Sequence, residues 1–325
     1  MALELLDSQG NKIVHHSGAI EQIANEVLTD GEQKVQLWDF AAANSSAEKR
    51  IEAITRVASV CFQKPELIGS SKLYDKLHRE SIGLPSSSFE FVPVLLSQED
   101  HWLIISNMEA IMDREPEALQ LPHVDRYGYT IPMKKSSPIV GGEPTIEIYK
   151  LTNFRALLRD LEILGRHFKD EEELSVETNF FNTDPDEIAL IRKMTAFFYI
   201  ETDIPTARQM MRHRASWQEL SRRYTSGKKL PFEFYLDSVS KSLLGDIWEQ
   251  TCIQALKSYD FLIENGVKAE NARRVLPIGM KTKVWSAWSV PQLLEMCSLR
   301  TEAKAQSEIR ELATTMRAMA LRDLQ

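Results

Sequence analysis

The chain has 325 residues, of which 43% are hydrophobic, and a formal net charge of -8. This is enough apolar material for one large core or two smaller ones, and the acidic balance argues against nucleic-acid binding through bulk positive charge. Three widely spaced cysteines without a CxxC pair argue against disulfides and metal sites, and the absence of a basic apolar leader or a long apolar run predicts a cytoplasmic protein without a membrane span.

The N-terminal region divides into an extension and the beginning of the main domain. Residues 1–33 resemble an extension, with short strands near 3–6 and 12–15 and a short helix near 20–28. A strand at Val35–Trp38 follows, and then a helix over Glu48–Phe62 with apolar residues at helical spacing. We therefore expect an N-terminal extension over 1–33 and a main domain over 34–325.

The middle of the chain differs from the segments on either side in its pattern of apolar and polar residues. Between residues 97 and 190, short apolar stretches alternate with DRYGYT, KKSSPIVGGEP and the acidic KDEEEL. Such punctuation is typical of turns and loops. We interpret residues 97–190 as a subdomain inserted in the main domain.

The C-terminal part is mainly helical. A strand is expected at Ala196–Glu201, a long helix ends at Asn265-Gly266, and a short helix through ENARRV ends before Pro277. The last helix is expected to begin at a capping box formed by Ser289 and Gln292, and to run past residue 310. The predicted class is α+β with helices dominant.

An arginine-rich segment lies between Gln209 and Tyr224, which reads QMMRHRASWQELSRRY. Arginine presents a planar fork of donors that suits phosphates and the carbonyl edge of a ring. The segment therefore predicts an anionic, planar ligand, and a nucleotide fits best. The alternative for any one of these arginines is a solvated or salt-bridged surface.

Three ordered segments then carry a family resemblance. The stretches ARQMMRHRASWQELSRRYTSGKKLPFEFYL, ENGVKAENARRVLP and LLEMCSLRTEAKAQSEIRELA resemble the signatures of the flavin-dependent thymidylate synthases, and SSSFEF at 86–91 is similar to the family's Ser-Pro-Phe-Glu-His stretch. The likeness is strong over about 195–317 and weaker over 35–94, whereas 1–33 and 97–190 have no counterpart.

The resemblance implies a helix-rich α+β domain with a small antiparallel sheet. It implies a homotetramer that holds FAD at subunit interfaces and converts dUMP to dTMP, with methylenetetrahydrofolate as carbon donor and NADPH as reductant. Two alternatives stay open: a relative that alkylates another pyrimidine nucleotide, and a non-catalytic nucleotide-binding protein on the same scaffold.

The resemblance also assigns residue roles. It implies that Arg300 and Ser221 are the catalytic residues. The residues implied to bind the nucleotide are Gln209, Arg212, Glu219, Leu220, Ser221, Arg222, Arg223, Arg273 and Arg300. Those implied to lie against the flavin are Ser87, Glu90, Arg212, His213, Arg214, Gln218, Glu219, Ser289, Glu295 and Lys304.

The chemistry of methylation agrees with these roles. Methylating C5 of a uracil requires electron density at that carbon, which grows when positive charge lies over the polar edge of the ring. Arg300 can provide this charge without a thiol nucleophile. No cysteine lies in a nucleophile-like setting, which disfavours a cysteine-dependent synthase.

The chain departs from the family pattern at the start of the last helix. The family's Asn-Ala-Arg is here Ser289-Val290-Pro291, its next Asn is Glu295, and its frequent His is Lys304. These changes remove donors for the flavin pyrophosphate.

Two cations could replace the missing donors. Lys304 would lie on the face of Arg300 if the helix were continuous, and Arg155 is the arginine of an Asn-x-Arg-like stretch in the insertion, Asn153-Phe154-Arg155. We therefore expect residues 97–190 to pack beside the site, although Asn153 also reads as a plain helix cap.

Overall fold

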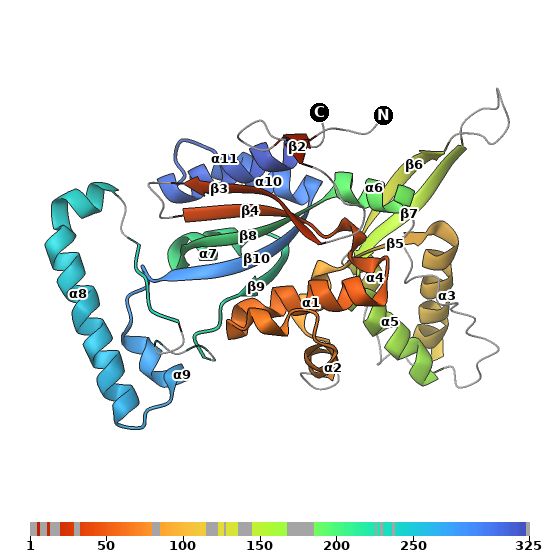
Figure 1. Cartoon of the computed structure of the whole chain (residues 1–325). Helices are drawn as coiled ribbons and strands as arrows, with labels where there is room; N and C mark the ends of the chain where they lie inside the picture. Colours follow the sequence, from red (N-terminus) through yellow and green to blue (C-terminus); the bar gives the residue numbers. More distant parts are fainter. Residues whose placement is uncertain are drawn as a thin grey trace.

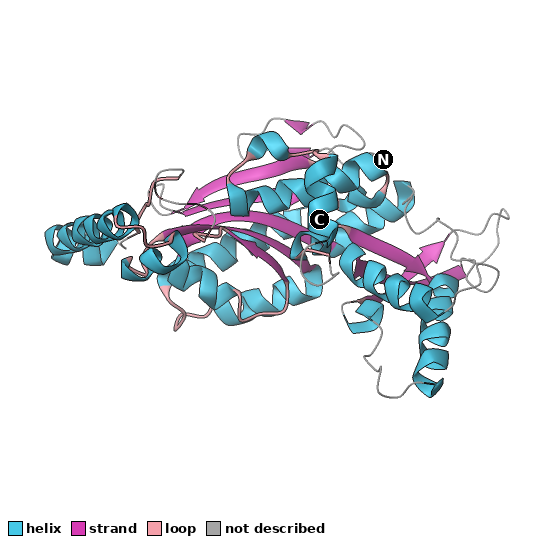
Figure 2. Ribbon diagram, turned by 90° about the horizontal axis from the view of Figure 1, so that it is seen from below, coloured by secondary structure: helices cyan, strands magenta, loops and turns pink. Residues whose placement is uncertain are grey.

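The structure is a computed structural model of the chain. It describes residues 5–6, 12–13, 20–28, 33–79, 85–114, 123–126, 128–135, 145–167, 185–223, 225, 227, 230–235 and 238–322. Antiparallel sheets and packed helices form the α+β fold that the sequence predicts (Figures 1 and 2).

A five-stranded antiparallel sheet forms the centre of the molecule. Its strand order is β3 (Glu21–Leu28), β4 (Gln33–Asp39), β8 (Thr195–Asp203), β10 (Lys281–Ser289) and β9 (Ser216–Glu219). Buried and half-buried residues alternate along β4, because successive side chains point to opposite faces of the sheet. The strands predicted at Val35–Trp38 and Ala196–Glu201 are confirmed.

Helices cover both faces of this sheet (Figure 1). On one face α1 (Ala47–Phe62) packs Ile54 and Val57 into a core shared with Phe197 and Trp285. On the other face lie α10 (Val290–Arg300) and α11 (Ser307–Arg322), whose apolar side chains pack against those of β4 and β8. The short helix α7 (Ile204–Met210) follows β8 directly. The sheet therefore separates two hydrophobic cores.

Two strands of a second, three-stranded sheet lie in the predicted insertion, and the third lies at its N-terminal border. Its order is β5 (Pro93–Ser97), β7 (Thr145–Asn153) and β6 (Tyr129–Lys135), and it is accompanied by α3 (Gln98–Arg114), α4 (His123–Arg126), α5 (Phe154–His167) and α6 (Pro185–Met194). Phe154 and Leu157 of α5 are buried in the same core as α1. The insertion therefore packs against the main sheet and shares its interior.

The long helix α8 (Ser238–Glu264) projects from one end of the molecule, while α3 lies at the other end (Figures 1 and 2). As predicted, the helix stops at Asn265-Gly266: α8 ends at Glu264, and Gly266 has a φ of 82°, which suits a residue without a Cβ. The helix α9 (Ala269–Ala272) and the 3-10 turn η6 (Arg273–Val275) follow before Pro277.

The remaining described elements are short. They are β1 (Leu5–Leu6), β2 (Lys12–Ile13), η1 (Ala41–Asn44), η2 (Pro65–Leu67), α2 (Ser71–Arg79) and η3 (Ser87–Phe91). The two short strands agree with the prediction for that stretch. Every helix within the described ranges is too short or too polar to traverse a lipid bilayer.

The helix predicted near 20–28 is wrong. These residues form β3, the edge strand of the main sheet, which pairs with β4 and contains a bulge between Gln22 and Ala24. An eight-residue apolar pattern does not separate helix from strand, and hydrogen bonding to β4 decides the outcome.

The prediction of one continuous C-terminal helix is also wrong. The capping box at Ser289 and Gln292 is confirmed, but α10 ends at Arg300, and the hydroxyl of Thr301 donates to the carbonyl of Cys297 at 2.7 Å. The carbonyl of Ala303 in the following turn accepts from the Arg310 side chain at 3.1 Å. Because these bonds satisfy carbonyls at the break, the chain can turn and start α11.

The break removes Lys304 from the face of Arg300. Lys304 lies in the turn with its side chain 82% exposed, and it pairs with Glu302 at 2.7 Å. The helical spacing that was expected to bring it beside Arg300 does not exist.

Candidate functional site

A polar cluster forms where α7, the RHR turn at 212–214 and the end of α10 meet. The Arg300 side chain donates from Nε to His213 Nε2 at 2.9 Å and from Nη2 to the carbonyl of Gln209 at 3.1 Å. A guanidinium has no acceptor, so His213 Nε2 must carry a lone pair and the imidazole is neutral with its proton on Nδ1. Burial, reinforced by Arg300, lowers the pKa of His213.

Two further predicted residues join this cluster. The side chain of Gln209 donates to Gln306 at 2.8 Å, which ties α7 to the turn before α11. The charge of Glu295 partly offsets the lowering of the His213 pKa, which places this exposed carboxylate close to the imidazole. The fold therefore gathers Gln209, His213, Glu295 and Arg300 from separate parts of the sequence.

Glu219 lies at the end of β9, beside this cluster in sequence but in a different setting. Its carboxylate accepts from the Thr282 hydroxyl at 2.9 Å. Burial raises the pKa of Glu219, and the bond from Thr282 and the charge of Arg208 oppose this rise. The next two residues end the strand, with Leu220 buried and Ser221 half-buried.

The arginines of the SRRY stretch have different surroundings. Arg222 is buried, donates to the carbonyls of Leu230 and Pro231 at 2.9 and 3.3 Å, and lies over the ring of Phe232 at 4.5 Å. This guanidinium is used inside the chain, as structural arginines are. The structure therefore places Arg222 where it stabilises the loop after β9.

Arg223 and Arg273 come together at one acidic residue. The Nε of Arg223 pairs with the carboxylate of Glu270 at 3.1 Å, and the Nε of Arg273 donates to the backbone carbonyl of Glu270 at 3.3 Å. Both arginines are exposed, so both guanidinium groups are accessible to an anion from solvent. Arg212 is exposed on the turn between α7 and β9 and is not part of these contacts with Glu270.

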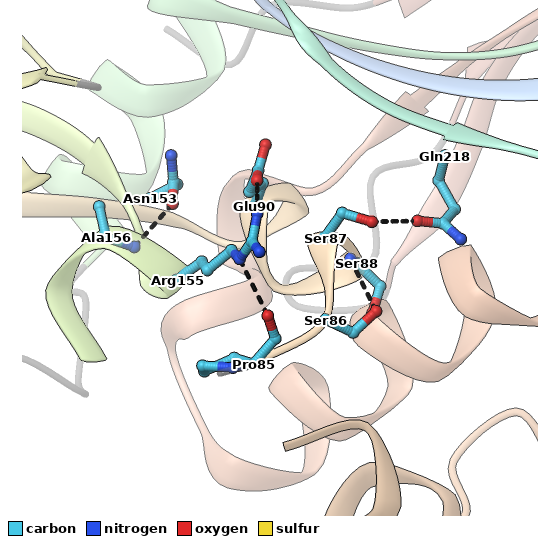
Figure 3. A network of polar contacts seen from close by, with 9 residues as sticks. All are labelled: Pro85, Ser86, Ser87, Ser88, Glu90, Asn153, Arg155, Ala156 and Gln218. Atoms are coloured by element: carbon cyan, nitrogen blue, oxygen red, sulfur yellow. Dashed lines mark hydrogen bonds and ion pairs between the residues drawn. The ribbon is translucent and has the colours of Figure 1, made fainter. Parts of the chain in front are cut away.

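The turn η3 joins the insertion to the arginine segment (Figure 3). On one side, the hydroxyl of Ser87 donates to the side chain of Gln218 in β9. On the other side, the carboxylate of Glu90 forms an ion pair with Arg155 of α5. Ser87, Glu90 and Gln218, which the resemblance implies to lie against a flavin, are thus connected through the turn η3.

A cleft of about 460 Å³ opens beside Glu90, at the ends of the two sheets. Its lining includes Glu90 and Arg214 as charged residues, Tyr129 and Asn153 from the insertion, and Trp288 from β10. The indole N–H of Trp288 is buried without a hydrogen-bond partner among the described residues. A concave site with a few convergent polar groups is the usual form of a small-molecule pocket.

Ser289 lies at the edge of this cleft, but its hydroxyl is already used. It is buried and accepts from the backbone N–H of Gln292 at 3.2 Å, as the cap of α10. Burial raises the pKa of Tyr129, and a hydrogen bond with Ser289 offsets part of that rise. Ser289 therefore contributes to the start of α10 and to the position of Tyr129.

The cleft contains residues that the motifs did not indicate. Tyr129 and Trp288 lie in no recognisable signature, and only the fold brings them to Glu90 and Arg214. Arg155 did carry a signal, the Asn-x-Arg-like spacing in the insertion. Asn153 is confirmed as a helix cap, because its side chain accepts from the backbone N–H of Ala156 at 3.0 Å.

The described residues hold no group of three or more His, Cys, Asp or Glu side chains that could bind a metal ion. All three cysteines are buried, and none forms a disulfide within the described part of the chain. Burial raises the pKa of Cys297 to about 11, which keeps its thiol protonated and inert.

The C-terminal part of the chain matches a known protein family. Residues 189–323 match the model of the thymidylate synthase complementing protein family. This range contains the RHR turn, the SRRY and ENARR stretches and Arg300, and it excludes most of the insertion.

Curated relatives are similar over the same part of the chain. The flavin-dependent thymidylate synthase of Aquifex aeolicus is 36% identical over 144 residues, which cover 38% of this chain and 44% of that protein. The enzyme of the same name from Thermotoga neapolitana is 33% identical over 128 residues, covering 37% and 58%. The chain thus spans about half the length of the curated relatives that it matches.

A solved structure gives a more distant likeness. The UMP/dUMP methylase PolB of Streptomyces cacaoi, determined with 5-Br UMP, is 22% identical and has a TM-score of 0.36 over 39% of this chain and 68% of that chain.

Proposed function

We propose that this chain, whose residues 189–323 match the model of the thymidylate synthase complementing protein family, is a flavin-dependent enzyme that methylates dUMP at C5. One observation carries the proposal. Two adjacent residues of the RHR turn contact different regions. His213 accepts a hydrogen bond from Arg300, and Arg214 lines the cleft. A nucleotide beside Arg300 and a cofactor in the cleft would therefore be neighbours.

Arg300 is the residue proposed to act on the uracil ring. Its bonds to His213 and Gln209 use Nε and Nη2, and Nη1 has no partner among the described residues. Such a preoriented donor can stabilise negative charge that develops on a ring oxygen during attack by C5. The neutral His213 accepts from Arg300 and holds the guanidinium in place.

Arg223 and Arg273 are proposed to bind the phosphate of the nucleotide. They already meet at Glu270, so a phosphate would approach two guanidinium groups from segments that are far apart in sequence. Arg212 is proposed to reach the same phosphate across a subunit interface. One charge-assisted contact contributes about 1.5 to 3 kcal/mol, so Arg223→Ala or Arg273→Ala should weaken dUMP binding by that amount and leave deoxyuridine binding almost unchanged.

Calorimetry with dUMP and deoxyuridine tests this assignment. Arg274→Ala is the matched control, because Arg274 is the exposed neighbour of Arg273. Equal affinity of the unsubstituted protein for the two ligands would show that no phosphate site exists.

The cleft is proposed to hold part of FAD. Its volume of about 460 Å³ lies within the range of about 300 to 1,000 Å³ usual for ligand sites. The Glu90 carboxylate can accept hydrogen bonds from hydroxyl groups, and Arg214 can pair with a phosphate. The N–H of Trp288 has no acceptor within the described ranges. A bound flavin would supply a hydride. NADPH is the proposed reductant and methylenetetrahydrofolate the proposed carbon donor.

The substituted positions at the start of α10 fit this picture only in part. Pro291 has no side-chain donor, and the hydroxyl of Ser289 caps the helix. Residues of the insertion and of β10 are therefore proposed to form the cofactor wall instead of residues 289–291.

A homotetramer is proposed on the basis of α8. This helix carries exposed apolar side chains, among them Leu243, Ile247 and Phe261, which are 75%, 65% and 64% exposed. An exposed apolar face on a projecting helix is typical of a surface that another subunit covers.

The test of the function is a direct one. Purified protein should carry a flavin absorption band, or acquire it with added FAD, and should convert dUMP to dTMP with methylenetetrahydrofolate and NADPH. A colourless protein that binds dUMP but cannot be loaded with FAD would favour a non-catalytic nucleotide-binding role. Turnover of another pyrimidine nucleotide in preference to dUMP would reassign the substrate.

A further inference from the structure

The insertion repeats a unit that also occurs in the main sheet. In the insertion, β7 ends at Asn153, which caps α5, and Asn153 lies opposite Pro93 at the start of β5. In the main sheet, β10 ends at Ser289, which caps α10, and Ser289 lies opposite Thr195 at the start of β8. Each unit is thus an antiparallel strand pair whose second strand runs into a capped helix.

The cleft lies between the capped ends of these two units. Pro93 and Asn153 line it from the first unit, and Thr195 and Gln292 line it from the second. The residue two positions after the cap is Arg155 in the first unit and Pro291 in the second. A cation that is absent from one wall of the cleft is therefore present at the equivalent place in the opposite unit.

Arg155 holds the turn that carries Glu90 (Figure 3). Its Nη1 pairs with the carboxylate of Glu90, and its Nε donates to the carbonyl of Pro85 at 2.9 Å. One rigid guanidinium thus binds both ends of the turn between residues 85 and 90. The ion pair is only partly open to solvent, with 30% of the Arg155 side chain and 19% of the Glu90 side chain exposed.

The neighbouring residue strengthens this attachment. The ring of Phe154 stacks on that of Phe89 with centroids 6.0 Å apart and planes at 7°, and the backbone N–H of Phe154 donates to the carbonyl of Val92 at 2.9 Å. The far side of the turn is bound to Gln218 through Ser87. The start of α5 and the strand β9 therefore fix η3 between them.

We infer that Arg155 is a positioning residue that holds the Glu90 carboxylate in a fixed orientation in the wall of the cleft. The ligand chemistry that matches this wall is a hydroxyl-rich chain joined to a phosphate, with Glu90 accepting from hydroxyls and Arg214 pairing with the phosphate. That this ligand is the ribityl phosphate part of FAD rests on the proposed function. Through Arg155, the insertion supplies a group needed for cofactor binding.

The binding experiment uses FAD and four variants of the full chain. Arg155→Ala and Glu90→Gln should each raise the Kd for FAD about tenfold or more, as expected when a charged hydrogen-bonding partner is lost. The double variant should be little worse than either single one, because both changes remove the same oriented carboxylate. Arg159→Ala, one turn further along α5, is the matched control and should leave the Kd unchanged.

The affinity for dUMP separates a local effect from a general loss of structure. It should stay within about twofold of the unsubstituted protein in every variant, because Arg155 lies outside the proposed phosphate site. FAD binding by Arg155→Ala that equals binding by Arg159→Ala, or fully additive effects in the double variant, would overturn the inference.

Hydrogen exchange tests the clamp without any ligand. Arg155→Ala should speed amide exchange at residues 86–92 and leave β10 unchanged, and Arg155→Lys should restore protection only partly because lysine lacks the planar fork. Unchanged exchange at 86–92 would overturn the positioning role, whatever the protein binds. Faster exchange in Arg155→Ala, together with an unsubstituted protein that binds no FAD, would refute the proposed function and leave the clamp standing.

Discussion

Residues that are neighbours in this sequence have very different surroundings. In the SRRY stretch, Arg222 is buried and bonded to backbone carbonyls, whereas Arg223 is exposed and pairs with Glu270. In the RHR turn, His213 contacts Arg300 and Arg214 lines the cleft. This cluster of similar residues thus divides into one buried structural arginine and several solvent-exposed arginines.

The first prediction concerns Arg300. Arg300→Ala should lower turnover of dUMP by about two to three orders of magnitude, the usual loss when one preoriented donor to a developing charge is removed. Single-turnover kinetics measure the effect, and thermal unfolding checks the fold. Ser298→Ala, at an exposed position on the same helix, is the control. Near-normal turnover by a folded Arg300→Ala protein would remove Arg300 from the mechanism.

The second prediction concerns the pH dependence of stability through His213. Burial and Arg300 lower the pKa of His213 below its ordinary value of 6.5, so the unfolded state takes up a proton at a higher pH than the folded state does. The stabilising contribution of the neutral imidazole is therefore complete above about pH 6.5 and is lost as the pH falls towards the folded pKa.

The melting temperature, measured from pH 8 down to pH 5, tests this sign. The unsubstituted protein should lose stability on acidification faster than His213→Asn does, so the two curves should converge at low pH. His101→Asn, on α3, is the control and should follow the unsubstituted protein. Parallel curves for His213→Asn and the unsubstituted protein would contradict the assignment.

At the scale of elements, the two capped helices hold the cleft open between them. The start of α10 is set by Ser289 and Gln292, and the start of α5 by Asn153. The break between α10 and α11 then leaves Arg300 at a helix end, where it can reach back to α7. The ends of helices, more than their lengths, therefore decide where the functional side chains lie.

The third prediction tests one of these ends. Ser289→Ala should lower the free energy of unfolding by about 1 kcal/mol, because it removes the side-chain acceptor for the Gln292 amide. Ser289→Thr should retain more of the stability, since its hydroxyl also caps a helix and introduces no charge into this buried position. Chemical denaturation measures both variants. A loss in Ser289→Thr as large as that in Ser289→Ala would show that the capping bond is not what Ser289 contributes.

At the scale of the whole molecule, the insertion and the projecting helix have different relations to the core. Phe154 and Leu157 of the insertion are buried with residues of α1, so deleting 97–190 would remove part of the main core. Point substitutions such as Arg155→Ala test its role more cleanly. In contrast, α8 extends away from the sheets and leaves apolar side chains exposed (Figure 1).

The fourth prediction follows from this difference. Ile247→Glu should reduce the assembly to smaller species, because a charge on a covered apolar face costs several kcal/mol of association free energy. Analytical ultracentrifugation measures the particle mass, and circular dichroism confirms that the subunit stays folded. Gln250→Glu, on the same helix, is the polar control. A sedimentation mass of one chain for the unsubstituted protein would refute the proposed assembly.

Elements with local signals can be predicted from the amino-acid sequence. The strands at 33–39 and 195–203, the helix at 47–62, the stop of α8 at Gly266 and the cap of α10 all follow from the spacing of apolar residues or from single capping and turn residues. The arginine motifs also follow from the chain alone, since they are contiguous.

Features that depend on distant partners require the packed fold. The stretch at 21–28 became a strand because β4 offers it hydrogen bonds, and the last helix broke because Arg310 and Thr301 satisfy carbonyls at the break. Glu90 meets Arg155 across 65 residues of sequence. No local pattern encodes such contacts, because they arise when two surfaces pack and each polar group must find a partner away from water.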